Sequence, residues 1–325
     1  MTERTAQGPD GVKFEHRPCP NGCAATDRLV IEAGDHLHGL PGRFRMVCCV
    51  HCGLMRTDPR PTPQTIGAFY PSDYGPYHSA PSVPRIKPPA WHRRLKARIH
   101  RFFGRDLRRL PDMPPGHMVE IGCSSGAYLV EMRARGWSVE GIEFSEQAAS
   151  VTRSLGIAVQ TASVETAHAP NRPADVLAAW MVLEHLHEPV ASLRQLRGWL
   201  QPGGTLVGVV PDASALERRV FGEYWYALQL PTHLYHFTPR SLRRVFEQAG
   251  WDLVALRWQP NCNNLLSSLE WMSQARGWQR TLRATRWLKN APEADKLRRR
   301  LAWLLGVSRQ SGRMEFWARP KGPAT

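Results

Sequence analysis

From residue 117 onward, short apolar stretches alternate with longer amphipathic ones, and this alternation leaves few possible folds. The apolar stretches predict strands at 117–121, 138–142, 157–160, 174–180 and 204–210. The amphipathic stretches predict helices at 126–135, 146–154, 189–200 and 239–249. A further pair of strands is expected at 252–258 and 313–318, on either side of a Trp- and Arg-rich insertion. The pattern predicts an α/β fold in which helices cover both faces of a mostly parallel sheet.

A glycine-containing turn, residues 119–126 (VEIGCSSG), follows the first predicted strand. Glycines at a strand-to-helix turn let a ligand approach the backbone closely. The dinucleotide fingerprint G-x-G-x-x-G is excluded, because Ser124 and Ala127 stand where it needs glycines. Two acidic residues accompany the turn. Glu120 is placed to hold a cationic amine, and Glu143, at the end of the next strand, to accept hydrogen bonds from two ribose hydroxyls.

Five of the seven cysteines lie within the first 52 residues. The amino terminus has no signal-peptide core, so a disulfide framework is not expected there. Two cysteine pairs supply the four thiolates that tetrahedral Zn²⁺ prefers, and the ligands we expect are Cys19, Cys23, Cys49 and Cys52. Such a closed site is structural. Cys48 and His51 are alternative ligands, and free reduced cysteines are the alternative to a metal site.

The chain divides into seven expected segments. They are a polar tail (1–14), a zinc-knuckle unit with a hairpin near 40–42 (15–58), a Pro- and Tyr-rich arm (59–90), a basic amphipathic helix (91–114), the α/β core (115–260), a basic helical insertion (261–307), and the last core strand with a tail (308–325). No internal repeat is present.

Four runs, VEIGCSSGAYL, VEGIEFS, ADVLAAWMVLEHLHEP and LQPGGTLVGVVPD, resemble in their order and spacing the motifs of class I S-adenosylmethionine-dependent methyltransferases. The resemblance covers about 115–260, with a matching last strand near 313–318. It implies a doubly wound, Rossmann-like sheet and S-adenosylmethionine as cofactor. Ser124 departs from the family, which usually has glycine there. The knuckle followed by CGLMRTDPRPTPQTIGAFYPSDY is similar to a subgroup that includes sugar and small-molecule methyltransferases, and it implies that Tyr70 and Tyr74 cover the active site. Packing the arm against the core is an equal alternative for both tyrosines.

The resemblance also implies which residues contact the cofactor. These are Gly122, Cys123 and Gly126 for the methionine part, Glu143 for the ribose, Phe144, Ala162 and Ser163 for the adenine, and Trp180 with Met181 for the opposite side. Glu120 joins this set through the amine. For Trp180, a place in the hydrophobic core is an equal alternative.

Methyl transfer is an in-line displacement, so alignment of the reactants is the main task of the enzyme. A hydroxyl nucleophile also needs a proton acceptor, and histidine titrates in the useful range. By resemblance to sugar methyltransferases, His233 is the expected general base, with Tyr235 or His236 assisting it. His185, which follows the fourth strand, is a further candidate. A purely structural role is the alternative for each of these histidines.

The net charge of +15 is concentrated in two segments. Residues 85–110 carry +9 and residues 276–309 carry +8, which leaves −2 for the rest of the chain. The second segment combines arginine with tryptophan, which suits a helical lid over the substrate, peripheral contact with an anionic membrane, or nucleic acid. Binding of nucleic acid is the least favoured of these three interpretations.

Taken together, the sequence predicts a methyltransferase that acts on an oxygen or carbon of a small glycosyl or anionic metabolite. An RNA methyltransferase and a non-catalytic binding protein of the same fold are the alternatives. No apolar run approaches the roughly 18 residues that span a bilayer. We therefore expect a cytoplasmic protein, with the inner face of the membrane as an alternative location. The sequence indicates no oligomeric state.

Overall fold

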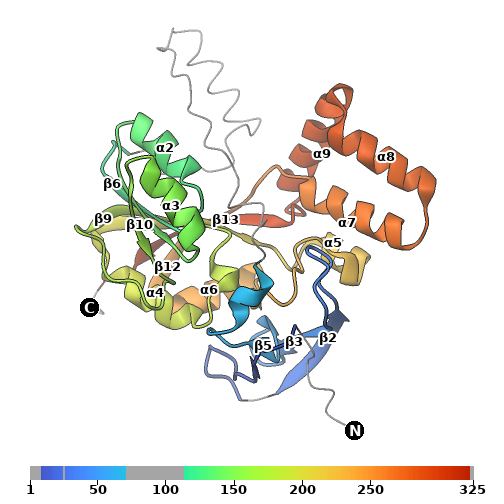
Figure 1. The fold of residues 1–325 in the computed structure, drawn as a ribbon, viewed down its shortest axis with the longest axis horizontal. Coiled ribbons are helices and arrows are strands. Elements are labelled where there is room, and N and C mark those ends of the chain that lie inside the picture. Colours follow the sequence, from blue (N-terminus) through green and yellow to red (C-terminus); the bar gives the residue numbers. More distant parts are fainter. Residues whose placement is uncertain (1–8, 25, 71–112, 323–325) are drawn as a thin grey trace.

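The computed structural model describes residues 9–24, 26–70 and 113–322 (Figure 1). The helix expected at 91–114 falls on residues outside this description, apart from its last two positions. Most of the expected arm, including Tyr74, also lies outside the described residues.

A seven-stranded sheet forms the centre of the molecule, in the order β12-β13-β10-β9-β6-β7-β8. Its strands are β6 (His117–Ile121), β7 (Ser138–Glu143), β8 (Ala158–Thr161), β9 (Ala174–Trp180), β10 (Leu200–Pro211), β12 (Trp251–Trp258) and β13 (Arg313–Pro320). Neighbours from β8 to β10 pair in parallel, whereas β13 pairs antiparallel with both β10 and β12. This confirms the predicted α/β, mostly parallel architecture.

Helices cover both faces of this sheet because its buried strands carry apolar side chains on both sides. On one face, Met118 and Val176 pack with Tyr128 and Met132 of α2 (Ala127–Ala134). On the other face, the alternate residues of the same strands pack against α4 (Pro189–Arg197) and α6 (Pro239–Gln248). The helix α3 (Glu146–Ser154) lies beside β8. All four helices occupy the stretches predicted for them.

The amino-terminal unit is a second, antiparallel sheet with the order β11-β4-β3-β2. It comprises β2 (Asp27–Ala33), β3 (Phe44–Cys49), β4 (Met55–Thr57) and β11 (Tyr235–His236). Strands β2 and β3 form the hairpin expected near residues 40–42. A separate two-stranded ladder joins β1 (Phe14–Glu15) to β5 (Arg60–Pro61), and a 3₁₀ turn, η1 (Ile66–Phe69), follows.

This unit does not stand apart from the core as the expected boundary at residue 58 implied. Strand β11 comes from the core segment and pairs with the edge of β4, where Tyr235 lies opposite Arg56. Phe44 and Met46 also share a hydrophobic cluster with Trp225 and Leu228. The reason is physical: a small sheet with one apolar face needs a partner to bury that face.

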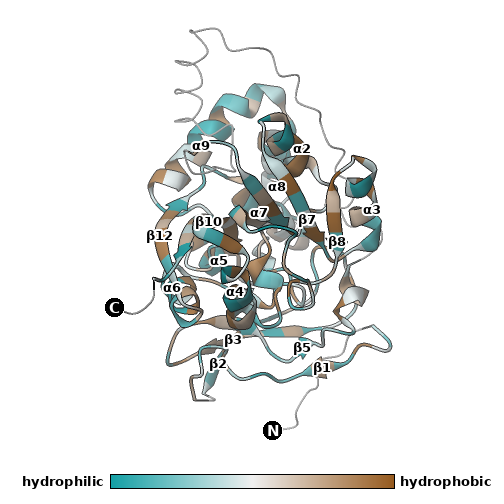
Figure 2. Ribbon diagram, turned by 90° about the vertical axis from the view of Figure 1, so that its left-hand side faces the viewer, coloured by the Kyte–Doolittle hydropathy of each residue, from teal (hydrophilic) through white to brown (hydrophobic). Residues whose placement is uncertain are grey.

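The insertion between β12 and β13 is helical, as predicted. It contains α7 (Asn263–Ala275), α8 (Gln279–Asn290), a 3₁₀ turn η5 (Pro292–Ala294) and α9 (Asp295–Val307). These helices lie together at one side of the molecule, on the opposite side of α5 (Leu216–Phe221) from the core helices (Figure 1). Coloured by hydropathy, α9 carries both polar and apolar residues (Figure 2). Among the described residues, no helix combines the length and the apolar character that crossing a membrane requires.

Candidate active site

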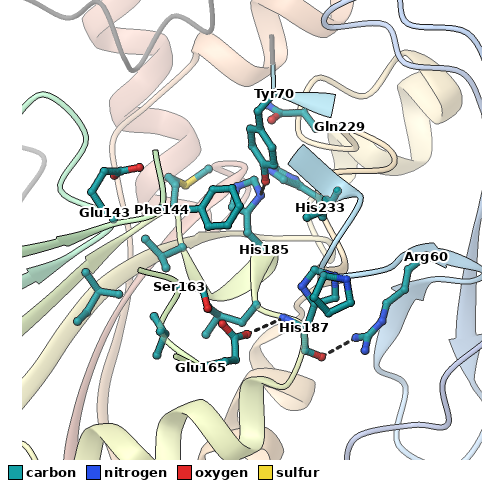
Figure 3. A pocket seen from close by; sticks show the side chains of 18 of the residues that line it. Arg60, Tyr70, Glu143, Phe144, Ser163, Glu165, His185, His187, Gln229 and His233 are labelled. Atoms are coloured by element: carbon teal, nitrogen blue, oxygen red, sulfur yellow. Dashed lines mark hydrogen bonds between the residues drawn. The ribbon is translucent and has the colours of Figure 1, made fainter. Parts of the chain in front are cut away.

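A cleft of about 1180 Å³ opens at the carboxyl ends of β6, β7 and β9 (Figure 3). Three parts of the chain line it: the loops after these strands, the amino-terminal stretch that includes Arg60 and Tyr70, and a third set comprising Tyr226, His233 and Arg313. Ligands of open α/β sheets bind at this edge, where the strand order reverses. The cleft exceeds the roughly 300–1,000 Å³ of a pocket for one small ligand, so it has room for two reactants.

The turn after β6 has a constrained backbone. Gly122 and Gly126 have φ angles of 66° and 76°, and Ser124 also lies in the left-handed region with φ of 50°. A Cβ atom on Gly122 would lie 2.8 Å from Val182, and one on Gly126 would lie 2.6 Å from Thr152. Both positions therefore require glycine. Thr152 Oγ1 donates a hydrogen bond to the carbonyl oxygen of Ser124 at 2.8 Å, which supports the serine in this uncommon conformation.

Glu143 ends β7 at the edge of the cleft and ties the turn to its neighbouring strand. Its Oε2 accepts a hydrogen bond from the amide of Ser124 at 2.8 Å, and its Oε1 accepts one from the amide of Ser145 at 2.9 Å. Burial raises the pKa of Glu143, and these amide bonds offset part of that rise. Glu143 also lines the cleft, so a ligand hydroxyl can reach its carboxylate. Phe144, next to it, is 51% exposed and lines the cleft with its ring.

The other residues expected at the cofactor fall into two groups. Ala162, Ser163 and Trp180 line the cleft. Glu120, Cys123 and Gly126 belong to β6 or to its turn but are not among the residues lining it. Glu120 is buried in the sheet, and the side chain of Cys123 packs beneath the turn against Leu129 and close to Gly141. The small residue at 141, which sequence reasoning missed, makes room for that sulfur.

Two of the candidate catalytic histidines face each other in the cleft. The rings of His185 and His233 lie 4.7 Å apart in an edge-to-face arrangement. His233 Nδ1 lies 2.9 Å from the carbonyl oxygen of Ala227, and His185 Nδ1 lies 3.0 Å from that of Thr232. A carbonyl accepts only from an N–H, so these contacts assign the ring proton of each histidine to Nδ1 and leave Nε2 as a proton acceptor.

Burial controls the protonation of both rings. It lowers the pKa of His185 to about 4 and that of His233 well below its ordinary value. For His233, the neighbouring His185 and His236 lower the pKa further. Both rings are therefore neutral at pH 7. The hydroxyl oxygen of Tyr70 lies 2.9 Å from His185 Nδ1, so this tyrosine of the arm reaches the cleft.

Tyr235 and His236 do not lie in the cleft, although they were expected to assist His233 there. The hydroxyl of Tyr235 donates to the carbonyl oxygen of His187 at 3.2 Å and lies 3.1 Å from Arg60 Nη1, and neither Tyr235 nor His236 lines the cleft. Both residues belong to β11, which pairs with β4, and their side chains are buried at that junction instead of in the cleft wall. Tyr235 therefore fixes the β4–β11 junction, while His236 is buried 6.2 Å from the ring of His233.

Sequence reasoning missed several cleft residues. Arg60 donates to the carbonyl oxygen of His187 at 2.5 Å, and Glu165 accepts from the amide of His187 at 3.0 Å (Figure 3). Gln229 and Arg313 line the same cavity. Arg60 lies within the run that resembles the methyltransferase subgroup, but no role was predicted for it, and the other three belong to no motif. They come from distant parts of the chain that only the fold brings to one cavity.

The four expected zinc ligands also meet. The sulfur atoms of Cys19, Cys23, Cys49 and Cys52 all lie within 4.8 Å of one another, in the amino-terminal unit and away from the cleft. Asn21 Nδ2 donates to Cys52 Sγ at 3.5 Å. Cys48 lies outside this group, with its thiol directed to the carbonyl oxygen of Cys49, and His51 is exposed. Four converging thiols without a disulfide fit a tetrahedral Zn²⁺ ion.

Comparison with known proteins agrees with this geometry. The family model described as a methyltransferase domain matches residues 90–256, which is just over half of the chain. A ubiquinone biosynthesis O-methyltransferase of Azoarcus sp. is 30% identical over an alignment of 159 residues, and the match covers 43% of this chain and 65% of the relative. The protein of the same name from Xanthomonas campestris is 27% identical over 180 residues, 52% of this chain and 73% of the relative. The chain thus spans just under two thirds of the Azoarcus protein.

Solved structures were also similar. An S-adenosylmethionine-dependent methyltransferase from Mesorhizobium loti has a TM-score of 0.44 at 17% identity. The superposition covers 65% of this chain and 93% of the Mesorhizobium chain. A putative methyltransferase of Haloferax volcanii, solved in complex with the Trm112 activator, has a TM-score of 0.47 at 14% identity, with 72% and 95% covered. On the match of the family model and the motifs in the cleft, the chain belongs to the class I S-adenosylmethionine-dependent methyltransferases.

Proposed function

We propose that the protein transfers the methyl group of S-adenosylmethionine to an oxygen atom of a small, acidic acceptor. The observation that supports this most strongly is that one cleft holds both Glu143 and the His185–His233 pair. A ribose anchor and a proton acceptor are thereby available to two reactants bound side by side. The names of the Azoarcus and Xanthomonas relatives support oxygen, rather than carbon, as the methylated atom.

One side of the cleft suits the cofactor. Glu143 would accept hydrogen bonds from the ribose hydroxyls, Phe144 would lie against the adenine, and the turn at Gly122 lets the methionine part approach the backbone. Ala162, Ser163 and Trp180 complete this wall. When bound, the cofactor supplies an electrophilic methyl group on a sulfonium.

The facing side suits the acceptor. His233 is neutral and its Nε2 is free of the ring proton, so it accepts the proton that a hydroxyl loses during transfer. His185 stands beside it in the same protonation state and is a second proton acceptor. Tyr70, bonded to His185, is a positioning residue.

Arg313 favours an acidic acceptor. It lines the cleft, its Nε donates to Asn264 Oδ1 at 3.4 Å, and none of the ion pairs among the described residues includes it. The acidic groups that face it, Glu184 and Glu217, are buried, which raises their pKa values to about 8 and about 7. A guanidinium without a carboxylate partner in a cavity wall is suited to bind a carboxylate or phosphate. Neither relative named above is named for a sugar acceptor.

Calorimetric titration with S-adenosylhomocysteine tests the cofactor half. We expect the intact protein to bind it and Glu143→Ala to bind at least about tenfold more weakly, since two hydrogen bonds to a charged group contribute more than about 1.4 kcal/mol. Glu146→Ala is the control, because Glu146 is an exposed acid of α3 outside the cleft. Glu143 also holds the turn, so Phe144→Ala provides a second variant that keeps those bonds. An intact protein that binds no S-adenosylhomocysteine would contradict the proposal.

A further inference from the structure

The outer face of α9 is apolar, although it faces solvent. Leu297, Trp303, Leu304 and Val307 are 50%, 40%, 56% and 64% exposed. Their spacing of six, one and three residues places them on one side of the helix. A surface helix of a globular protein normally turns its polar side outward and its apolar stripe inward. In α9 a second apolar stripe faces outward, so the packing of the described chain does not account for it.

Exposed basic residues lie on the same side of α9 as this stripe, and others lie on the neighbouring helix α8. Lys296 and Arg300 lie on the same side of α9, and both are exposed. On α8, Arg280 and Arg283 share a helical face with Trp287, which is 52% exposed. Within the described ranges these four cations have no ion-pair partner, whereas Arg286, Lys289, Arg298 and Arg299 each have one. We call the exposed residues of α8 and α9 named here the basic-aromatic surface.

The basic-aromatic surface is separate from the cleft, because none of its residues lines the cavity. Residues 276–309 carry a net charge of +8, so a second copy of the chain docked on the same face would set like charges against each other. An anionic lipid headgroup layer satisfies both features at once. Its phosphates pair with the free cations, and its interfacial region accepts the apolar side chains to a depth of several ångströms.

We propose that α8 and α9 form a docking surface for an anionic membrane, to which the enzyme binds peripherally. Each Lys or Arg near such a surface adds to the attraction, which falls off within a Debye length. Tryptophan suits the interface, because its ring is apolar and its N–H is polar. In Figure 1, α8 and α9 lie at the upper right rim of the molecule and the amino-terminal sheet lies at the bottom, so a flat surface can reach the two helices without contacting that sheet.

Co-sedimentation of the full chain with vesicles tests this. We expect binding to vesicles of phosphatidylcholine mixed with phosphatidylglycerol, and little binding to phosphatidylcholine alone. The double variant Leu304→Glu, Val307→Glu should bind at least about tenfold more weakly, since it removes two apolar side chains from the interface and sets two carboxylates against the anionic lipid. The control is Leu29→Glu, Val151→Glu, which alters exposed apolar residues of β2 and α3.

A second pair of variants tests the charges. Arg280→Gln, Arg283→Gln should weaken binding and reduce its salt dependence, whereas Arg240→Gln, Arg243→Gln on α6 should leave both unchanged. All variants should still bind S-adenosylhomocysteine, which shows that they fold and keeps this test separate from that of the proposed activity.

Three results would overturn the proposal. One is failure of the intact chain to bind the anionic vesicles at low salt, and another is full binding by Leu304→Glu, Val307→Glu. The third is an intact chain that sediments as a dimer while this variant sediments as a monomer, since a second copy would then cover the stripe. Binding that depends on the arginines but not on Leu304 and Val307, and that RNA displaces, would assign the surface to nucleic acid instead.

Discussion

His233 combines burial with a fixed ring proton, and the two together decide its chemistry. The carbonyl oxygen of Ala227 holds the proton at Nδ1, and burial keeps the ring neutral. A proton acceptor in the cleft is thereby maintained well into the acid range. Tyr235, only two residues away, points to Arg60 and has no such access to the cleft.

Replacing His233 by glutamine should therefore reduce turnover by about 10²–10⁴-fold while leaving the affinity for S-adenosylhomocysteine unchanged, since general-base catalysis contributes about that factor. The measurement is S-adenosylhomocysteine release with a panel of hydroxylated carboxylic acids as acceptors. Tyr235→Phe is the matched control and should lose less than tenfold. Wild-type turnover by His233→Gln would assign the base to another residue, with His185 the first to test.

His185 makes folding stability depend on pH. Its pKa is about 4 in the folded protein, below the value near 6.5 of an exposed histidine, because burial disfavours the charged ring. The unfolded chain therefore binds a proton between pH 6.5 and 4 that the folded chain does not. The contribution of His185 to the free energy of unfolding is complete above pH 6.5. As the pH decreases toward 4, this contribution decreases by up to about 1.4 kcal/mol per pH unit.

We expect thermal denaturation of His185→Gln to show a shallower loss of stability than the wild type between pH 6.5 and 4. Glu184→Gln tests the alkaline part of the pH dependence of folding stability. Burial raises the pKa of Glu184 to about 8 in the folded protein. The contribution of this residue to the free energy of unfolding is therefore complete below about pH 4.5, and it is lost as the pH rises toward 8. That variant should flatten the alkaline side of the curve. An acid limb of unchanged slope in His185→Gln would contradict the assignment.

Among the elements, those with clear periodicity were predictable and the shortest ones were not. The core strands and helices lie where apolar alternation and capping residues place them, as at Thr238, whose side chain accepts from the amide of Ser241 at 3.1 Å. By contrast, β1, β5 and β11 have two residues each, too few to show a period. Their pairing is set by tertiary contacts, which is why the junction with the amino-terminal unit escaped prediction.

The same argument applies to the cleft. Its cofactor side follows from local motifs around Gly122 and Glu143 and was predicted. Its acceptor side depends on residues such as Arg60, Tyr70 and Arg313, which only the folded chain brings together. Tyr70 was reached by family resemblance alone, and nothing near Arg313 in the sequence marks it as part of a site.

Loss of zinc should unfold the strands of the amino-terminal sheet together. We propose that the four-cysteine cluster holds one structural Zn²⁺ per chain, and a closed thiolate site contributes its binding energy to folding. Chelation or Cys52→Ala should therefore expose the amides of β2, β3 and β4 to hydrogen exchange, and those of β11 with them. The central sheet should keep its protection.

Elemental analysis provides the control for this prediction. Cys48→Ala should retain the metal, because its sulfur lies outside the cluster. Protein that is purified without chelators and contains no zinc, or a Cys48→Ala variant that loses it, would contradict the assignment of ligands.

At the scale of the whole molecule, the positive charge is concentrated in two segments of the sequence. The net charge of +15 arises from residues 85–110 and 276–309, and the remainder of the chain is close to neutral. The second segment lies mostly on α8 and α9, and none of its residues lines the cleft. If the membrane proposal holds, this charge decides where the enzyme docks, whereas Arg313, the residue of β13 that lines the cleft, contributes to what it binds.

The pairing of β4 with β11 also affects how the chain is made. Met55 and His236 lie opposite each other in the ladder although 181 residues separate them in the sequence. At the roughly 5–20 residues per second of synthesis, the ribosome needs about 9–36 s to add that stretch. During this interval the edge of β4 has no partner strand, and an open edge invites association with other chains. The nascent protein is therefore most vulnerable to aggregation before residue 236 has emerged, and slower translation of the core would lengthen that period.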